Sequence, residues 1–336
     1  MASTSNDRQS DDEIRASMLA WRVHRFGSPD VMTFESVLRP DPGAGEVLIK
    51  VEAAGVGPWD AWIRAGKSAL PQPLPLTPGS DLAGEIVAVG AGVSGLRAGD
   101  PVYGVTNPAF VGAYAEYALA SAAMIASKPT SLTYIEAASV PVVAVTAWQA
   151  LFDQARLEAG QTVLIHGAAG NVGAFAVQLA RHADLRIIAT VATKDIASVR
   201  TLGADTVIDY QTQRFEDEAR DVDAVIDLVG GETQARSFRV LRRGGKLISA
   251  VSPPDQNLAQ RHGVDAAFFL VDVTRARLTQ IGGLLDAGKL KTQVGAVLPL
   301  ADARDAHLML EKLLPQPNGK IVLAVGTDAR RASTPR

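Results

Sequence analysis

One strand–glycine–helix segment constrains the fold of this chain more than any other feature. The β-type run Thr162–His166 (TVLIH) leads directly into a glycine loop and then into an apolar helix that continues through Ala180. Dinucleotide-binding α/β folds need three small residues in such a loop: one for a tight turn, one for close approach to a pyrophosphate and one for helix–strand packing. These positions are occupied by Ala168, Gly170 and Gly173.

This context predicts a dinucleotide site, and the alternative is a packing turn that merely contains glycines. Backbone N–H groups at the start of the helix would face the diphosphate, helped by the helix dipole. The residues assigned to that contact are Gly170, Asn171, Val172 and Gly173.

Residues 134–273 alternate between short apolar strands and helical segments. The strand-like runs after the glycine loop are Leu185–Thr190, Thr206–Tyr210, Ala224–Val229, Lys246–Val251 and Ala267–Val271. Because strands that alternate with helices form parallel sheets, we predict an α/β fold with a Rossmann doubly wound sheet.

The regions on either side are different in character. Residues 18–133 hold short β-type runs broken by Gly and Pro, which predicts a small barrel or sandwich. Residues 274–326 add two helices and two strands that have no place in a completed Rossmann sheet, so we assign them to the first domain, which becomes discontinuous. The polar termini, 1–17 and 327–336, are expected to be disordered.

Composition excludes several classes of site and partner. The chain has no cysteine, which excludes disulfides, thiolate nucleophiles and Cys-ligated zinc, and no two of its histidines form a local metal motif. A formal net charge of −3 gives no reason to expect nucleic acid or an anionic membrane as partner. No apolar run reaches the roughly 20 residues of a spanning helix, so a soluble, cytoplasmic protein is expected.

The end of the second predicted strand decides between the two nicotinamide coenzymes. An NAD site would place Asp or Glu there to bind the ribose 2′-hydroxyl, whereas Ile188–Asp195 reads IATVATKD. Lys194 can pair with a 2′-phosphate and Thr193 can donate a hydrogen bond to it. We therefore predict NADP(H) as cofactor; the alternative is that Lys194 is a solvated residue at a helix start.

Several further motifs follow one another along the chain. They include Gly55–Gly66 (GVGPWDAWIRAG), Pro78–Gly90 (PGSDLAGEIVAVG), Thr146–Leu151 (TAWQAL) and Gly319–Leu323 (GKIVL). In this order, and together with the glycine loop, they resemble the medium-chain dehydrogenase/reductase superfamily, specifically its zinc-independent quinone-oxidoreductase (zeta-crystallin-like) branch. The resemblance covers nearly the whole chain, about residues 18–325.

The resemblance implies a GroES-like catalytic domain, a homodimer, and reduction of quinones or α,β-unsaturated carbonyls. Zinc-dependent relatives carry a Cys and a Gly-His-Glu motif, but this chain has no Cys and reads Gly79-Ser80-Asp81. Without a metal there is no Lewis acid to stabilise an alkoxide, so ordinary alcohol dehydrogenation is not expected.

The resemblance also implies coenzyme contacts outside the glycine loop. Lys194 and Tyr210 match positions that contact the 2′-phosphate, and Thr146 matches a contact in the preceding helix. The residues matched to the ribose, the nicotinamide and the C-terminal end of the coenzyme site are Gly230, Ala250, Ser252, Phe268, Phe269, Leu270, Asn318 and Lys320. Each could instead be an ordinary turn or core residue.

Aromatic and acidic residues are the candidates for the substrate pocket. Trp59, Trp62 and Phe269 are predicted to line it, although Trp62 could equally be a core residue. Asp60 and Tyr114 are weak candidates for proton transfer. Asp60 is more readily explained by an i,i+4 pair with Arg64, and Tyr114 by packing between the domains.

Two further positions complete these expectations. His166 is expected to point into the sheet core. Where relatives often read Gly-Val-Asn-Pro, this chain has Gly57 in place of Asn, which is expected to remove a polar substrate contact and to enlarge the pocket.

The leading functional hypothesis is an NADPH-dependent reductase that transfers hydride to quinones or enones without a metal. The alternative is an NADPH-binding protein of low turnover with a structural or sensing role, because no proton donor is evident. The apolar run Ala266–Val271 is a candidate edge strand for a dimer.

Overall fold

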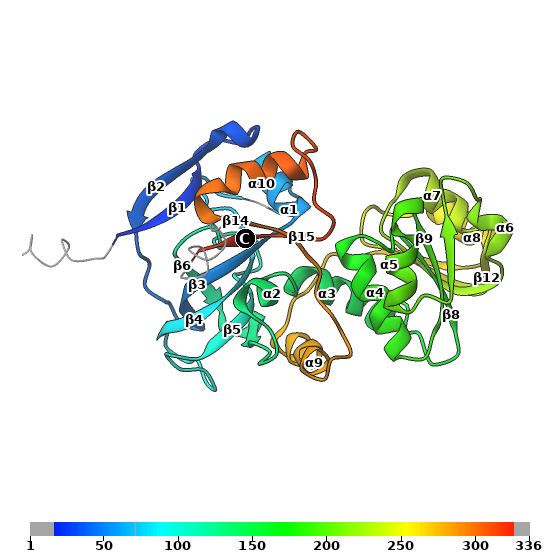
Figure 1. The fold of residues 1–336 in the computed structure, drawn as a ribbon, viewed down its shortest axis with the longest axis horizontal. Coiled ribbons are helices and arrows are strands. Elements are labelled where there is room, and N and C mark those ends of the chain that lie inside the picture. Colours follow the sequence, from blue (N-terminus) through cyan, green and yellow to red (C-terminus); the bar gives the residue numbers. More distant parts are fainter. Residues whose placement is uncertain (1–16, 71, 326–336) are drawn as a thin grey trace, which may run out of the picture. The chain divides into compact units, whose positions relative to one another are not determined.

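The computed structural model describes residues 17–70 and 72–325. The chain forms two compact units, both drawn in Figure 1. Of the described residues, 17–70, 72–128, 133–139 and 294–325 form the β-rich unit, and 129–132 and 140–293 form the Rossmann unit. The predicted disordered termini lie outside the described residues, apart from Ser17, which begins a strand.

The Rossmann unit contains a six-stranded parallel sheet with the order β10-β9-β8-β11-β12-β13. This is the doubly wound order in which the chain first moves to one edge and then returns to the centre. The carboxyl ends of the central strands β8 and β11 meet where the order reverses, and that is where such sheets bind ligands. The strands are β8 (Thr162–His166), β9 (Arg186–Val191), β10 (Thr206–Asp209), β11 (Val222–Asp227), β12 (Leu241–Ser249) and β13 (Asp265–Phe268).

Helices cover this sheet. The strand residues Val163, Leu164 and Ile165 have no exposed surface, as expected where helices pack on both faces of a parallel strand. In Figure 1, α4 and α5 lie together over the β8–β10 half of the sheet, and they contact each other and these strands. The helices are α3 (Pro141–Trp148), α4 (Asn171–His182), α5 (Ile196–Leu202), α6 (Phe215–Glu218), α7 (Gly231–Ser237), α8 (Gln256–His262) and α9 (Arg275–Asp286), and the single π-helical turn η3 (Gln149–Gln154) continues α3.

The β-rich unit is built on a seven-stranded sheet with the order β14-β15-β3-β4-β5-β7, in which β6 also pairs with β3. A separate hairpin joins β1 and β2. Ile49, Leu82, Ile86 and Ile125 lie in the core of the unit without exposed surface. The strands are β1 (Ser17–Val23), β2 (Met32–Leu38), β3 (Glu46–Val56), β4 (Asp81–Val89), β5 (Pro101–Val105), β6 (Tyr117–Ser121), β7 (Ile125–Ser127), β14 (Val294–Pro299) and β15 (Lys320–Ala324).

Three short helices complete this unit: α1 (Pro58–Arg64), α2 (Tyr134–Ala138) and α10 (Ala303–Leu310). The predicted discontinuity is present, because β14, α10 and β15 pack with the N-terminal strands.

The unit boundaries differ from the predicted ones at both junctions. The helix α2 belongs to the β-rich unit, whereas α9, which the sequence pattern assigns to that unit, belongs to the Rossmann unit. Two contacts hold α9 in place: it packs on α3, and its C-terminal Asp286 accepts hydrogen bonds from the Ser131 N–H (2.9 Å) and the Thr130 hydroxyl (3.2 Å). A helix that follows the last strand of a sheet can still pack on another helix of the same unit, and strand counting does not reveal this.

Candidate functional site

The glycine loop of the Rossmann unit has the shape that a diphosphate requires. Gly167 takes a left-handed φ of 69°, and the Gly170 N–H donates to its carbonyl at 3.0 Å. A Cβ on Gly173 would lie 2.3 Å from that same carbonyl oxygen, so only glycine allows α4 to approach the loop this closely. The tight turn therefore falls on Gly167, one residue before the predicted Ala168, whose buried side chain faces the core.

The first turn of α4 offers unpaired donors. Gly170 is the N-cap residue, and because it has no side chain, no side-chain hydrogen bond caps the helix. The N–H groups of Asn171, Val172 and Gly173 have no partner in the preceding turn of an α-helix, and the helix dipole adds positive potential there. Such a terminus binds anions such as phosphate, so these residues fit a dinucleotide.

Lys194 and Tyr210 follow the carboxyl ends of the adjacent strands β9 and β10. Both side chains are exposed, Tyr210 to 60%, and so both are accessible to a ligand. Neighbouring Thr193 is already engaged: its hydroxyl lies 2.6 Å from an Asp209 carboxylate oxygen and 2.9 Å from the Gln211 side-chain oxygen. The hydrogen bond from Thr193 lowers the pKa of Asp209, which is therefore a carboxylate beside the predicted phosphate contact.

A buried carboxylate that the sequence analysis missed organises the ends of β11 and β12. Asp227 accepts hydrogen bonds from the N–H groups of Val229 (3.1 Å) and Gly230 (2.8 Å), the Gln234 amide (2.9 Å) and the Ser249 hydroxyl (2.8 Å). The sequence signal was an acid that ends the apolar run AVID, at the central switch point of the sheet.

The predicted residues of these loops come together around that carboxylate. Gly230 has a φ of 79°, and a Cβ there would lie 3.3 Å from the Ser252 hydroxyl oxygen. Ala250 donates its N–H to the Asp227 carbonyl at 3.2 Å, and the Gln234 amide donates to the Ser252 carbonyl at 3.0 Å. The loop conformation is thus fixed before any ligand binds.

The remaining predicted coenzyme residues differ in accessibility. Phe268 and Leu270, at and beyond the end of β13, are 37% and 60% exposed, whereas Phe269 is buried. The Thr146 hydroxyl donates to the Val142 carbonyl within α3 at 2.7 Å, so it is available to a ligand only as an acceptor. In the β-rich unit, Asn318 is exposed and Lys320 is buried.

His166 lies in the core of the Rossmann sheet, as predicted. Its ring nitrogens are 2.9 Å from the Thr190 hydroxyl and 3.0 Å from the Ser237 hydroxyl, and its ring meets Phe215 edge-on. Burial lowers the pKa of His166 to about 4, so the ring is neutral and structural.

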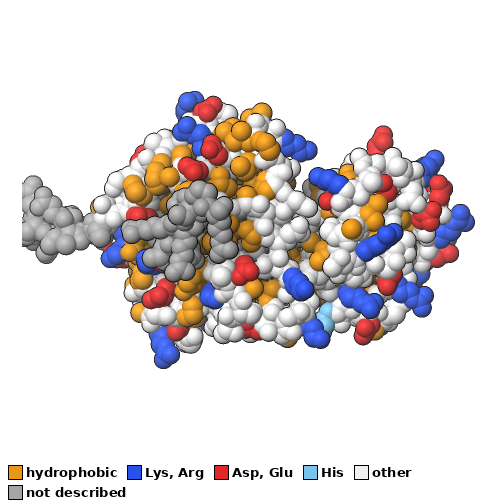
Figure 2. All heavy atoms as spheres, in the orientation of Figure 1, with side chains coloured by type: hydrophobic (Ala, Val, Ile, Leu, Met, Phe, Trp, Pro, Cys, Tyr) orange, Lys and Arg blue, Asp and Glu red, His pale blue; other side chains and the backbone are white. Residues whose placement is uncertain are grey.

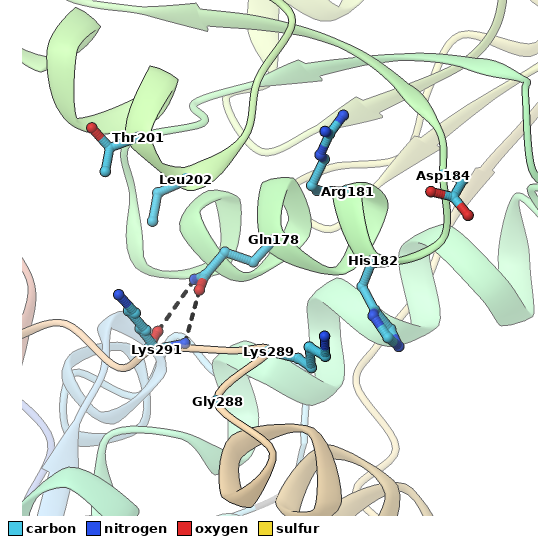
Figure 3. Close-up of a pocket in the computed structure, with 9 residues that line it drawn as sticks. All are labelled: Gln178, Arg181, His182, Asp184, Thr201, Leu202, Gly288, Lys289 and Lys291. Atoms are coloured by element: carbon cyan, nitrogen blue, oxygen red, sulfur yellow. Dashed lines mark hydrogen bonds between the residues drawn. The ribbon is translucent and has the colours of Figure 1, made fainter.

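A separate pocket of about 410 Å³ opens at the other end of α4 (Figure 3). Gln178 lines it, and its side-chain amide exchanges hydrogen bonds with the backbone N–H (2.8 Å) and carbonyl (3.2 Å) of Lys291. Arg181, His182 and Lys289 line it as well. Because α4 spans twelve residues, about 18 Å, this pocket is distinct from the glycine loop.

On the face shown in Figure 2, basic and acidic side chains of the Rossmann unit are interspersed.

Asp60 and Tyr114 form a buried pair in the β-rich unit. The Tyr114 hydroxyl donates to an Asp60 carboxylate oxygen at 3.0 Å, and the Gly57 N–H donates to the same oxygen at 2.8 Å, which caps α1. Neither residue has exposed surface. Burial raises the pKa of Asp60 to about 7, opposed by the Gly57 hydrogen bond and the Lys320 charge.

The predicted Asp60–Arg64 ion pair is wrong. Arg64 is buried and pairs instead with Glu311, just beyond the end of α10. Asp60 turns back to the start of its own helix because an acid at that position satisfies the N-cap N–H.

Among the described residues, His307 of α10 has no hydrogen-bond partner at either ring nitrogen; its ring meets that of Tyr114 edge-on at 5.9 Å. Tyr114 thus packs inside the β-rich unit.

A second set of polar side chains, Ser80, Asp81 and Lys320, lies at Trp59. The indole N–H donates to the Ser80 hydroxyl at 2.9 Å, and the Lys320 ammonium nitrogen lies 4.4 Å from the ring centroid. Lys320 also pairs with Asp81 at 2.9 Å, and both side chains are almost fully buried. The expected pocket enlargement at Gly57 is wrong, because a Cβ there would lie 2.2 Å from the Trp59 ring, which already fills the space. Trp62 on α1 is 54% exposed and is therefore not a core residue.

The described residues contain no cluster of three or more His, Cys, Asp or Glu side chains that could hold a metal ion. The chain has no Cys, and Ser80, which stands where the Gly-His-Glu motif of zinc-dependent relatives has His, offers a hydroxyl that already accepts a hydrogen bond from Trp59. These residues do not fit a zinc ion. No helix in residues 17–70 and 72–325 is long and apolar enough to cross a membrane.

Comparisons with known proteins assign the family. Residues 43–130 match the alcohol dehydrogenase GroES-like domain, and residues 202–323 match a domain described as zinc-binding dehydrogenase. The 2-methylene-furan-3-one reductase of Solanum lycopersicum is 35% identical over 92% of this chain and 80% of its own length. The chain belongs to the medium-chain dehydrogenase/reductase superfamily.

Solved structures place this medium-chain dehydrogenase/reductase with quinone-oxidoreductase-like members. The quinone oxidoreductase of Coxiella burnetii matches with a TM-score of 0.85 and 32% identity, over 93% of this chain and all of the other. A mycobacterial protein complexed with NADPH matches with a TM-score of 0.79 and 32% identity, over 91% of this chain and 99% of the other. The predicted family and fold class are confirmed, and the chain is an oxidoreductase of this family.

Proposed function

We propose that this protein is an NADPH-dependent reductase that transfers hydride to quinones or α,β-unsaturated carbonyls without a metal. The observation that carries the proposal is the glycine loop at the uncapped N-terminus of α4, where only glycine at position 173 allows the helix to approach. The names of the tomato and Coxiella relatives support an enone or quinone as acceptor.

The residues that would hold the coenzyme lie at the carboxyl edge of the Rossmann sheet. The N–H groups that begin α4 would bind the diphosphate, and the network around Asp227 would fix the loops at Gly230 and Ser252. Lys194 and Tyr210 would bind the 2′-phosphate. The Asp209 carboxylate beside Thr193 opposes a phosphate, so the preference for NADPH depends on the charge of Lys194.

NADPH, when bound, supplies the hydride that adds to the carbon conjugated with the acceptor's carbonyl. The protein's own residues would position the acceptor. Asp60 and Tyr114 are fully buried and bonded to each other, which argues against direct proton transfer from either to a substrate. The proton for the enolate oxygen is then expected from solvent.

Enzyme assay tests the proposal directly. The purified protein, NADPH and a panel of quinones, enones and alkenals should give loss of absorbance at the wavelength of reduced nicotinamide, faster than in enzyme-free mixtures. The same panel with NADH should react more slowly. Rates equal to the enzyme-free background across the whole panel would contradict the proposal.

The alternative is an NADPH-binding protein of low turnover with a structural or sensing role. It is favoured by the burial of both candidate proton donors. Tight binding of NADPH in calorimetry, without turnover of any acceptor, would establish it. Robust turnover of one acceptor would exclude it.

A further inference from the structure

The carboxyl edge of the Rossmann sheet has a polar half and an apolar half. Beyond β9 and β10 it carries the Lys194 ammonium group and the Tyr210 hydroxyl. Beyond β11, β12 and β13 the exposed side chains include Val229, Val251 and Leu270. Each half of a doubly wound sheet takes one nucleotide of a dinucleotide, so the apolar half is the place for the nicotinamide nucleotide.

The segment 269–274, which joins β13 to α9 and contains Leu270, has no regular secondary structure. Side chains from outside the segment hold it at Asp272. The Gln149 side-chain oxygen accepts a hydrogen bond from the Asp272 N–H at 2.8 Å. Arg277 donates to the Asp272 carbonyl at 2.6 Å and to the Asp272 carboxylate at 2.8 Å. Both backbone groups of Asp272 are therefore bonded to side chains.

Asp153 joins these contacts to the π-helical turn η3. The Arg277 Nε and Nη2 atoms lie 3.0 Å and 2.9 Å from one Asp153 carboxylate oxygen. Gln149 and Asp153 both belong to η3, and residues four apart share one face of a helix. One face of η3 and the first turn of α9 thus form a clamp on Asp272, which we call the Asp272 clamp (Gln149, Asp153 and Arg277).

The Asp272 clamp is shielded from solvent where it meets the backbone. Gln149 is buried, and the Arg277 side chain is only 22% exposed. Water therefore competes little with these bonds, and hydrogen bonds from a charged donor are the stronger ones. Single π-helical turns such as η3 occur frequently at functional sites.

We propose that Gln149 and Arg277 are positioning residues for the nicotinamide half of the coenzyme. By holding Asp272, they keep Leu270, two residues earlier, at the apolar half of the carboxyl edge. This inference rests on the proposed function, because it takes NADPH as the ligand. A segment that already has its binding conformation loses no affinity to its own ordering.

Calorimetry with two ligands tests this role. Adenosine 2′,5′-bisphosphate contains the adenosine and the 2′-phosphate of NADPH but no nicotinamide. Gln149→Met and Arg277→Met should each weaken NADPH about tenfold, as expected if the freed segment has its binding conformation about one tenth of the time. The affinity for adenosine 2′,5′-bisphosphate should stay at the wild-type value, because Lys194 and the start of α4 are unchanged.

Arg242→Met is the matched control. It removes an arginine that pairs with Asp223 at 2.7 Å near the starts of β11 and β12, at the opposite edge of the same sheet. This variant should lower the melting temperature and leave both affinities unchanged. A merely structural role for Gln149 and Arg277 predicts that their variants behave like Arg242→Met, or that they weaken both ligands by the same factor. Either result would overturn the inference.

Failure of the proposed function gives a different result. A wild-type protein that binds NADPH but reduces no quinone or enone would contradict the proposed reaction alone, and the two affinities still decide the role of the Asp272 clamp. A wild-type protein that binds NADPH no more tightly than adenosine 2′,5′-bisphosphate would overturn the inference, since no nicotinamide contact would then exist for the clamp to support. A wild-type protein that binds neither ligand would contradict both.

Discussion

At the scale of single residues, the proposed preference for NADPH over NADH depends on Lys194. Its side chain is exposed at the end of β9, beside the Thr193–Asp209 hydrogen bond. Lys194→Ala should weaken NADPH by about 1–3 kcal/mol, the magnitude of a charge-assisted contact, and leave NADH nearly unchanged. Titration calorimetry with both coenzymes measures this difference.

Lys289→Ala is the matched control, because it removes an exposed lysine from the pocket at the other end of α4. It should alter neither affinity. If Lys194→Ala weakened NADPH and NADH equally, the 2′-phosphate would have to be recognised by another group.

Asp60 should make the stability of the protein depend on pH. Burial raises its pKa in the folded state to about 7, from the ordinary value of 3.8 for an aspartate. Between these values the folded protein keeps the proton while the unfolded chain loses it, so the free energy of unfolding falls as pH rises through this window. Asp60→Asn removes this contribution and should become more stable than wild type toward neutral pH, by on the order of 2–4 kcal/mol.

Urea denaturation of both proteins across this pH range gives the difference. The Asn side-chain oxygen can accept the same bonds from Tyr114 and Gly57, and its amide would replace an oxygen that has no partner among the described residues. The buried His166 and His307, whose pKa values burial lowers, act in the opposite direction but are present in both proteins and cancel. A difference that does not change with pH would show that Asp60 is charged in the folded state.

At the scale of elements, the N-terminus of α4 is fixed by the close contact between Gly173 and Gly167. Gly173→Ala would place a methyl group 2.3 Å from a backbone oxygen that cannot rotate away. The helix must shift, which should cost about 1–3 kcal/mol of stability and weaken NADPH. Thermal unfolding and calorimetry measure the two effects.

Gly283→Ala in α9 is the matched control in the same unit. A Cβ there meets nothing within 4 Å, and the residue is exposed within a helix. This variant should gain ~0.5–1 kcal/mol, because alanine is the better helix former. Wild-type NADPH affinity in Gly173→Ala would show that the diphosphate does not bind at this helix.

An element could be predicted where its signal lies within one short stretch of the sequence. The strand β8 matches its predicted range, because a continuous apolar run bounded by turn residues indicates a buried strand. The β1–β2 hairpin was missed, since its burial alternates irregularly and its connection is long. The predicted strand Ala267–Val271 begins two residues too late and ends three too late, as apolar residues continue past the edge of the sheet.

The functional residues also fall into two groups: those whose signal lies in one stretch of the sequence, and those that only folding brings together. The glycine loop is local in sequence, so the residues of its helix start could be named in advance. The Trp59–Ser80–Lys320 group joins residues from α1, β4 and β15, and only the folded sheet brings them together. The Arg64–Glu311 pair joins residues 247 positions apart, whereas the sequence offered the nearer Asp60. Contacts between residues so far apart cannot be inferred from a single sequence.

At the scale of the whole molecule, the open question is whether two chains associate through β13. This strand is the edge of the Rossmann sheet, and an edge presents unpaired backbone groups to a second strand. The Phe269 N–H donates to β12, so by alternation the N–H groups of Ala267 and Asp265 also face β12, while that of Ala266 faces outward. The Ala266 carbonyl faces outward as well, where the Gln256 amide reaches it at 3.2 Å.

Proline substitutions in β13 distinguish an effect on chain association from an effect on folding stability. Ala266→Pro removes only an outward donor, which edge strands tolerate, so it should convert a dimer to a monomer in analytical ultracentrifugation without lowering the melting temperature. Ala267→Pro removes a donor to β12 and should destabilise the Rossmann unit by about 3 kcal/mol or more. A wild-type chain that sediments as a monomer would show that no dimer forms through this edge. An Ala266→Pro variant that stays dimeric would also exclude this edge as the interface, since backbone pairing there needs the Ala266 N–H.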